Sequence, residues 1–254
     1  MKAIILAAGR GSRLGSITAA QPKPLTVLAG KPLLEWQIAA LHSAGVSEVH
    51  LVSGYCREAL EPYGDSRLYN PHWASSNMVR SLLRADALLA AEPMLVCYGD
   101  IVYRPDIIQS LIDSPAPLAM TYDLDWWSLW SARFDDPLSD AESFRQADGQ
   151  LLAIGERTDD RRQIEGQYMG LLKFTPEGWQ HVRDLLAGLT GEQIDKLDMT
   201  SLLRRLLDNG TPIAAVAIRG GWVEVDNPSD ITLYEQLIAR PGWSHDWRYG
   251  SASK

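Results

Sequence analysis

The first twenty-five residues constrain the fold of this chain more than any other stretch. Residues 2–8 read K-A-I-I-L-A-A, a short apolar run that contains β-branched isoleucine. Runs of this kind form strands that are buried on both faces of a sheet. The run breaks directly into Gly9-Arg10-Gly11-Ser12-Arg13-Leu14. We therefore expect a buried N-terminal strand that leads into a glycine-rich loop.

The composition of this loop is typical of a phosphate-binding site. Glycine lets backbone N–H groups approach an anion closely, and arginine adds a positive charge with a forked geometry. Lys23 follows between two prolines, which stiffen the segment and hold the ammonium group in place. The loop lacks a third glycine, because Leu14 stands there, and it lacks the P-loop lysine. An ordinary dinucleotide site is therefore excluded, and a tight turn without a ligand is the alternative.

Composition and charge exclude several classes of protein. The 254 residues are 46% hydrophobic and 22% charged, as in a soluble globular protein with one large domain or a domain with an appendage. The net charge of −8 argues against a nucleic-acid binder, which needs a basic face. Cys56 and Cys97 lie in apolar segments and indicate core thiols in a reducing compartment. Without a signal peptide or an apolar span, we expect a cytoplasmic protein that does not contact a membrane.

Strand-like and helix-like apolar segments alternate along the first half of the chain. The predicted strands are residues 46–52, 94–98 and 118–122, and the predicted helices are residues 33–41, 78–91 and 105–112. This alternation favours a three-layer α/β/α, Rossmann-like fold with a mostly parallel mixed sheet.

The second half of the chain continues this pattern after an interruption. Residues 123–144 lack clean periodicity and are expected to form an inserted loop region. The further predicted strands are residues 151–155, 167–174, 213–218 and 222–226, and the further helices are residues 177–186, 200–207 and 231–239. We expect one domain over residues 1–240, with an insertion at about 123–170. In the C-terminal tail, residues 241–254, two tryptophans either cover an interface or fold back on the core.

Two aspartates stand at the C-terminal ends of predicted strands, where an open α/β sheet binds its ligands. Asp100 follows Gly99, and Asp226 ends the last predicted strand. Two carboxylates can hold Mg²⁺ against a triphosphate, and the five histidines show no ligand spacing. The alternatives are an exposed loop aspartate at position 100 and a cap for the last helix at position 226.

The run L-A-A-G-R-G-S-R-L, followed by Q-P-K-P-L and G-K-P-L-L, resembles the signature of nucleotidyltransferases that join NTPs to phosphorylated small molecules. The resemblance covers the chain except for about fifteen C-terminal residues. It implies that Asp100 and Asp226 bind the metal, Arg13 binds the triphosphate, and Lys23 contacts phosphate in the transition state. It also implies a nucleotide site that contains Leu6, Ala7, Ala8, Gly9, Gly11, Ser12, Arg13, Lys23, Ser53, Gly54, Tyr55, Ser76 and Asn77.

The middle of the chain resembles the cytidylyltransferase branch, whose members act on phosphocholine, aminoethylphosphonate or phosphorylated amino compounds such as phosphoglutamine. The segments that carry this resemblance include D-L-D-W-W-S-L-W at 123–130, D-A-E at 140–142 and E-G-Q-Y-M-G at 165–170. Aromatic faces beside carboxylates suit an ammonium group, and an arginine suits a phosphate or phosphonate. The residues expected to bind this acceptor are Asp125, Trp126, Trp127, Trp130, Arg133, Glu165 and Tyr168.

Each of these acceptor assignments has an alternative. The tryptophans and Tyr168 could pack in the core, and Glu142 could serve only as a salt-bridge partner in a loop. The resemblance implies an enzyme that transfers CMP from CTP to a small phosphorylated or phosphonate acceptor and releases pyrophosphate. The rival functions are a sugar-1-phosphate nucleotidyltransferase that uses UTP, dTTP or GTP, and a nucleotide-sensing domain without catalysis. The sequence leaves open the identity of the acceptor and whether the chain forms a homodimer.

Overall fold

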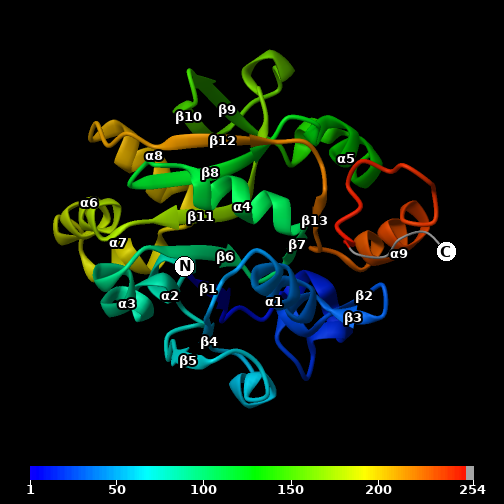
Figure 1. Ribbon diagram of the computed structural model, residues 1–254, viewed down its shortest axis with the longest axis horizontal. Coiled ribbons are helices and arrows are strands. Elements are labelled where there is room, and N and C mark those ends of the chain that lie inside the picture. The colour runs from blue at the N-terminus through cyan, green and yellow to red at the C-terminus, as the bar shows by residue number, and fades with distance from the viewer. Residues whose placement is uncertain (250–254) are drawn as a thin grey trace.

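A mixed nine-stranded sheet forms the centre of the molecule in the computed structural model, which describes residues 1–249 (Figure 1). Its strands are β1 (Lys2–Ala7), β4 (Val49–Ser53), β5 (Ser66–Tyr69), β6 (Met94–Tyr98), β8 (Leu118–Asp123), β9 (Glu142–Ala147), β10 (Gln150–Arg157), β11 (Gln167–Phe174) and β12 (Ala214–Ile218). They lie in the order β5-β4-β1-β6-β11-β8-β12-β10-β9. Only β10 and β11 run against the other strands of this sheet, so the prediction of a mostly parallel mixed sheet is confirmed.

Helices cover both faces of the sheet. They are α1 (Leu33–Ser43), α2 (Met78–Leu82), α3 (Asp86–Ala91), α4 (Pro105–Asp113), α5 (Trp126–Arg133), α6 (Pro176–Ala187), α7 (Gly191–Lys196), α8 (Met199–Asp208) and α9 (Pro228–Leu237). Helices α1, α4, α5 and α9 pack on one face with Ile5, whereas α2, α3, α6 and α8 pack on the other with Ile4. The alternation of side chains along buried strands therefore produces two cores and the predicted three layers.

A second, two-stranded sheet brings distant parts of the chain together. Strand β7 (Ile101–Tyr103) pairs antiparallel with β13 (Trp222–Glu224), and Ile101 lies opposite Glu224. Asp100 directly precedes β7 and Asp226 follows β13, so this pairing places the two aspartates side by side. The backbone N–H of Val225 donates to the carbonyl of Asp100 at 2.9 Å. A further hairpin joins β2 (Val27–Leu28) to β3 (Lys31–Pro32).

Three predicted elements differ from the structure. The predicted helix over 78–91 is divided into α2 and α3 by a 3₁₀ turn at Leu83–Ala85. The predicted loop over 123–144 contains α5, since Trp126, Leu129 and Trp130 lie on one face of a helix and are buried. Helix α9 begins at Pro228, because Asn227 and Asp230 form a capping box at its start.

The C-terminal tail packs on the core as far as residue 249. Trp247 is buried, and its ring packs edge-on against Trp36 and Tyr234. His245 is also buried and contacts Asp123 at the end of β8. Of the two predictions for the tail tryptophans, the structure supports folding back. Tail residues 250–254 lie outside the described part.

Neither of the described cysteines takes part in a disulfide. Cys97 is buried in β6, whereas Cys56 is partly exposed after β4. Within residues 1–249, no helix is long and apolar enough to span a bilayer.

Candidate active site

Four charged side chains from the front, middle and end of the chain meet at the C-terminal ends of β1 and β6. The ammonium Nζ of Lys23 donates to Asp100 Oδ2 at 2.7 Å and to Asp226 Oδ1 at 2.5 Å. Arg13 Nη2 donates to the same Asp226 oxygen at 3.0 Å. We call Arg13, Lys23, Asp100 and Asp226 the charge cluster. Its members are the four residues that the sequence predicted to be catalytic.

Two glycines make this close approach possible. A Cβ atom at Gly99 would lie 2.6 Å from the carbonyl oxygen of Leu6 and 2.8 Å from Cγ of Pro24. At Gly11, φ is +70°, and a Cβ would lie 2.8 Å from the side-chain carbons of Lys23. Lys23 can therefore cross the glycine-rich loop only because position 11 has no side chain.

The charges in the cluster stabilise one another. Burial alone would lower the pKa of Lys23, but Asp100 and Asp226 raise it above its ordinary value. Burial would raise the pKa of Asp226, but Lys23, Arg13 and Arg133 lower it below its ordinary value. Lys23 is therefore a cation and Asp226 an anion at neutral pH.

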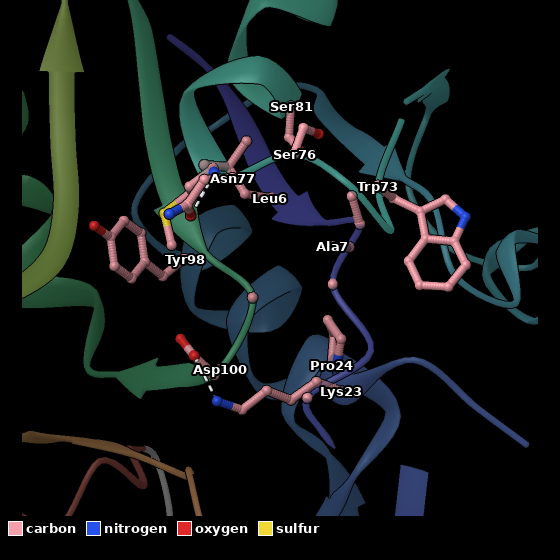
Figure 2. Close-up of a pocket in the computed structure, with 15 residues that line it drawn as sticks. Leu6, Ala7, Lys23, Pro24, Trp73, Ser76, Asn77, Ser81, Tyr98 and Asp100 are labelled. Atoms are coloured by element: carbon pink, nitrogen blue, oxygen red, sulfur yellow. Dashed lines mark hydrogen bonds and ion pairs between the residues drawn. The ribbon is translucent and has the colours of Figure 1, made fainter. Parts of the chain in front are cut away.

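A cavity of about 170 Å³ opens beside the charge cluster (Figure 2). Lys23 and Asp100 lie at one end of it, and Ser76, Asn77 and Ser81 lie at the other. We call it the first cavity, and its lining is Leu6, Ala7, Ala8, Gly9, Gly11, Lys23, Pro24, Trp73, Ser76, Asn77, Met78, Ser81, Tyr98, Gly99 and Asp100. Most of the predicted nucleotide site is therefore gathered around one hollow.

The other predicted nucleotide residues lie behind or outside this cavity. Ser12 and Arg13 are exposed on the loop, and the hydroxyl of Ser53 donates to the carbonyl of Leu68. Tyr55 donates its backbone N–H to the carbonyl of Ala8, so residues 53–55 support the glycine-rich loop from behind. A Cβ at Gly54 would lie 2.5 Å from that same carbonyl oxygen.

Six lining residues were absent from the predicted site, namely Pro24, Trp73, Met78, Ser81, Tyr98 and Gly99, and three of them contribute polar or aromatic side chains: Trp73, Ser81 and Tyr98. Tyr98 directly precedes Gly99, and Ser81 lies four positions after Asn77, one helical turn along α2. Adjacency and helical spacing could have identified these two. Trp73 lies in a turn, and no periodic pattern in the sequence indicates its position.

A second cavity of about 200 Å³ adjoins the charge cluster. Tyr98 lines both cavities, and Arg13 and Asp226 of the charge cluster line the second. Its full lining is Arg13, Tyr98, Trp130, Asp140, Glu142, Ser143, Phe144, Ile154, Gln167, Tyr168, Thr200, Glu224 and Asp226. Of the seven predicted acceptor residues, Trp130 and Tyr168 line this cavity.

Arg133 was expected to meet the phosphate of an acceptor, but its side chain is 0% exposed. It forms ion pairs with Glu224 and with Asp230, and it lies 3.8 Å from Asp226. Burial raises the pKa of Glu224 to about 7 against the opposing charge of Arg133, with Asp226 adding to the rise. Because the buried guanidinium of Arg133 is already paired with these carboxylates, we do not propose that Arg133 binds the acceptor.

The other four predicted acceptor residues also point elsewhere. Trp126 is buried in the core, and Trp127 packs beneath the guanidinium of Arg161 at 3.9 Å. Asp125 accepts from Arg219 at 2.6 Å. Glu165 is exposed and accepts from the backbone N–H of Gln146. For Trp126 and Trp127 the packing alternative therefore describes the structure.

The charge cluster fits a divalent metal ion. Within the described residues, no three acidic, histidine or cysteine side chains gather to hold a metal on their own. However, Asp100 and Asp226 converge on one cation, and Asp100 Oδ1 is buried without a hydrogen-bond partner. Mg²⁺ commonly binds one or two carboxylates and completes its shell with phosphate oxygens and water. Two carboxylates with an unpaired oxygen suit that coordination.

The fold and site together define a class of protein. A glycine-rich loop after a central strand faces two strand-end aspartates across a cavity, as in enzymes that transfer nucleotides. The family described as the MobA-like NTP transferase domain matches residues 3–153 of this chain. The chain therefore belongs to that family and is a nucleotidyltransferase.

Its relatives include enzymes that carry cytidylyl names. The chain is 35% identical to CTP:phosphoglutamine cytidylyltransferase from Campylobacter jejuni, over 92% of this chain and 98% of the relative. It is 34% identical to CMP-5'-(3-aminopropyl)phosphonate synthase from Streptomyces rubellomurinus, over 91% of this chain and 37% of the relative. The solved inositol-1-phosphate CTP transferase from T. maritima superposes with a TM-score of 0.73 at 19% identity, over 92% of this chain and 95% of that one. The predicted resemblance to the cytidylyltransferase branch is confirmed.

Proposed function

We propose that this chain is a Mg²⁺-dependent cytidylyltransferase. It transfers CMP from CTP to a small phosphorylated or phosphonate acceptor and releases pyrophosphate. The observation that carries this proposal is the convergence of Arg13, Lys23, Asp100 and Asp226 between two adjoining cavities. The family membership supports nucleotidyl transfer, and the relatives' names support CTP.

The two cavities suit the two substrates. The nucleoside of CTP occupies the first cavity, with its triphosphate along the glycine-rich loop toward Arg13 and Lys23. The acceptor occupies the second cavity, and one of its phosphate or phosphonate oxygens attacks the α-phosphorus. The bond from the α-phosphorus to the bridging oxygen breaks, and pyrophosphate leaves with that oxygen. Residues Arg13 and Lys23 offset the negative charge that gathers on the phosphates.

Asp100 and Asp226 would hold the metal. A bound Mg²⁺ supplies positive charge at the phosphate oxygens and orients the triphosphate. Lys23 remains protonated beside these carboxylates and is placed to bind phosphate, because its ammonium group already lies at the mouth of the first cavity.

Pyrophosphate release tests this proposal. Purified protein with Mg²⁺ is assayed with CTP, UTP, dTTP and GTP against phospho-amines, phosphonates and sugar 1-phosphates. We expect turnover with CTP and an amine-bearing phosphate or phosphonate. Asp100→Asn should lower kcat by about 10²–10³-fold, whereas Asp106→Asn, exposed on α4, should leave it unchanged.

Two results would replace the proposal. Turnover with UTP, dTTP or GTP and a sugar 1-phosphate would identify the sugar-nucleotide alternative. Nucleotide binding without turnover on any acceptor would identify a sensing domain. Normal turnover by Asp100→Asn would contradict the metal assignment.

A further inference from the structure

The end of the first cavity that lies away from Lys23 and Asp100 carries polar side chains that the charge cluster does not use (Figure 2). Ser81 is 7% exposed and lines the cavity there, together with Ser76 and Asn77. A triphosphate held at the Lys23 end would place the nucleobase toward these three residues. Their hydrogen bonds therefore bear on which base the cavity accepts.

A buried amide behind the cavity fixes the direction of these hydrogen bonds. Asn70 is 0% exposed, and its Oδ1 accepts from the backbone N–H of His72 at 3.0 Å. A backbone N–H can only donate, so this bond fixes which end of the amide carries the nitrogen. The amide Nδ2 of Asn70 donates to Ser81 Oγ at 2.9 Å and to Ser76 Oγ at 3.2 Å. Both serine hydroxyls therefore act as acceptors toward Asn70.

The two serines differ in where their own protons go. Ser76 Oγ donates to the carbonyl of His72 at 2.7 Å, and a carbonyl can only accept, so this proton is bound within the protein. Within residues 1–249, the hydroxyl of Ser81 accepts from Asn70 and donates to no protein group. Buried hydroxyl protons are nearly always hydrogen-bonded. The proton of Ser81 is therefore available to a ligand in the cavity.

Asn77 adds a second donor at this end of the cavity. Its Oδ1 accepts from the backbone N–H of Met78 at 2.8 Å and caps α2. The other end of the amide, Nδ2, donates to no protein group in the described part of the chain. Ser81 and Asn77 thus offer a ligand one hydroxyl donor and one amide donor.

Cytosine and uracil differ in what they offer to two neighbouring donors. In a cytidine nucleotide, O2 and N3 of the base are adjacent acceptors. In a uridine nucleotide, O2 is again an acceptor, but N3 carries a hydrogen and donates. A donor placed at N3 therefore bonds to cytosine, whereas in uracil it faces another donor and both lose their hydrogen bonds.

We propose that Ser81 donates to N3 of the cytosine of CTP, that Asn77 donates to O2, and that Asn70 is the positioning residue that keeps Ser81 a donor. This inference rests on the proposed function and explains its choice of base. A free hydroxyl could accept from uracil N3–H instead. Beside Asn70 that exchange would leave the proton of Ser81 without an acceptor, which costs free energy.

Three nucleotides test the inference: CTP, UTP and 3-deaza-CTP, which keeps O2 and the 4-amino group but has C–H in place of N3. Calorimetric titration in the presence of Mg²⁺, without an acceptor, measures each Kd. We expect wild type to bind CTP about 10- to 100-fold more tightly than 3-deaza-CTP or UTP. Ser81→Ala should weaken CTP binding and make the affinities for CTP and 3-deaza-CTP nearly equal.

Asn70→Asp tests the positioning role. An ionised carboxylate oxygen in place of the amide nitrogen accepts from Ser81, which would then turn a lone pair toward the cavity. We expect the ratio of CTP affinity to UTP affinity to fall, because cytosine N3 loses a donor and uracil N3–H gains an acceptor. Circular dichroism checks the fold of each variant, and the Ser81→Ala comparison decides the contact at N3 independently of Asn70→Asp.

Ser75→Ala is the matched control. The hydroxyl of Ser75 also donates to the carbonyl of His72, at 3.4 Å, but Ser75 is exposed and lies outside the lining of the first cavity. This variant should keep the wild-type order of affinities for the three nucleotides.

The outcomes separate this inference from the proposed function. Equal binding of CTP and 3-deaza-CTP by wild type would overturn the contact at N3, even if CTP is turned over. A CTP preference that survives in Ser81→Ala would overturn the role of Ser81, and an unchanged CTP-to-UTP ratio in folded Asn70→Asp would overturn that of Asn70. Discrimination against 3-deaza-CTP that Ser81→Ala removes, without pyrophosphate release on any acceptor, would leave the base contact standing and overturn the cytidylyltransferase.

Discussion

Gly11 allows the side chain of Lys23 to lie across the glycine-rich loop. We predict that Gly11→Ala displaces Lys23, because the new Cβ would lie 2.8 Å from its side-chain carbons. Misplacement of a catalytic group by about 1 Å can cost about 10²-fold in rate. Steady-state kinetics should therefore show a fall in kcat of that order.

Gly15→Ala provides a matched control for this substitution. Gly15 also has a positive φ, of +59°, but a Cβ there would have nothing within 4 Å. Both variants should lose about 1–3 kcal/mol of stability, because alanine is strained at these positive φ values, and only Gly11→Ala should lose activity. Equal kcat values for the two variants would show that Lys23 does not need the space.

Arg133 joins three elements. It lies at the end of α5, and it pairs with Glu224 of β13 and with Asp230 in the first turn of α9. Asp230 in turn accepts from the backbone N–H groups of Asp226 and Asn227. The guanidinium therefore holds in place the loop that carries Asp226.

We predict that Arg133→Met destabilises the protein by about 3–5 kcal/mol, because it leaves buried carboxylates without a cation. Urea denaturation measures the loss. Arg161→Met is the control. Arg161 is exposed, and its substitution removes only a cation–π contact with Trp127, so the free energy of unfolding should fall by about 1 kcal/mol or less. If the two variants lost similar stability, Arg133 would not be the link between α5 and α9.

At the scale of elements, the sequence predicted buried strands better than helix boundaries. Strand β6 is a continuous apolar run and was predicted with its observed bounds. Helix α5 was missed because it is short and lies within a stretch, residues 123–144, that has no clean periodicity as a whole, although Trp126, Leu129 and Trp130 are at helical spacing. On the buried face of this helix, the ring of Trp130 packs against Trp126 of the same helix and against Trp222 of β13. The contact with Trp222 comes from distant sequence, so the local pattern could not reveal what this face packs against.

At the scale of the whole molecule, Asp123 connects the C-terminal tail to the sheet. Its buried carboxylate accepts from the backbone N–H of Gly220 and the indole N–H of Trp222, and it contacts His245 Nε2 at 2.8 Å. Burial would raise the pKa of Asp123, but His245 and the backbone donors lower it below its ordinary value. The ionised carboxylate is therefore the form that stabilises the fold.

This direction fixes the expected pH dependence. The contribution of Asp123 is fully present above the unfolded-state pKa of about 3.9 and is lost as pH falls through the lower folded-state pKa. We predict that Asp123→Asn costs about 2–3 kcal/mol at pH 7 and flattens the loss of stability below pH 4. Urea midpoints between pH 7 and pH 3 measure both effects.

Asp125→Asn is the control for Asp123→Asn. Asp125 pairs with Arg219 at the surface, with side chains 32% and 68% exposed, so its loss should cost at most about 1 kcal/mol. A variant Asp123→Asn that remains as acid-sensitive as wild type would show that other carboxylates control the acid limit.

The α/β fold class, the glycine-rich loop after β1 and the four charge-cluster residues could all be identified before the structure was known. These features depend on local order along the chain: an apolar run, a glycine next to it, and an aspartate directly after a strand. Which charged groups are available to a ligand depends instead on how the chain packs in three dimensions. Arg133 is neutralised by Glu224, 91 positions away, whereas Glu142 is left without a cation. Such pairing depends on which distant elements pack together, and a single sequence does not display it.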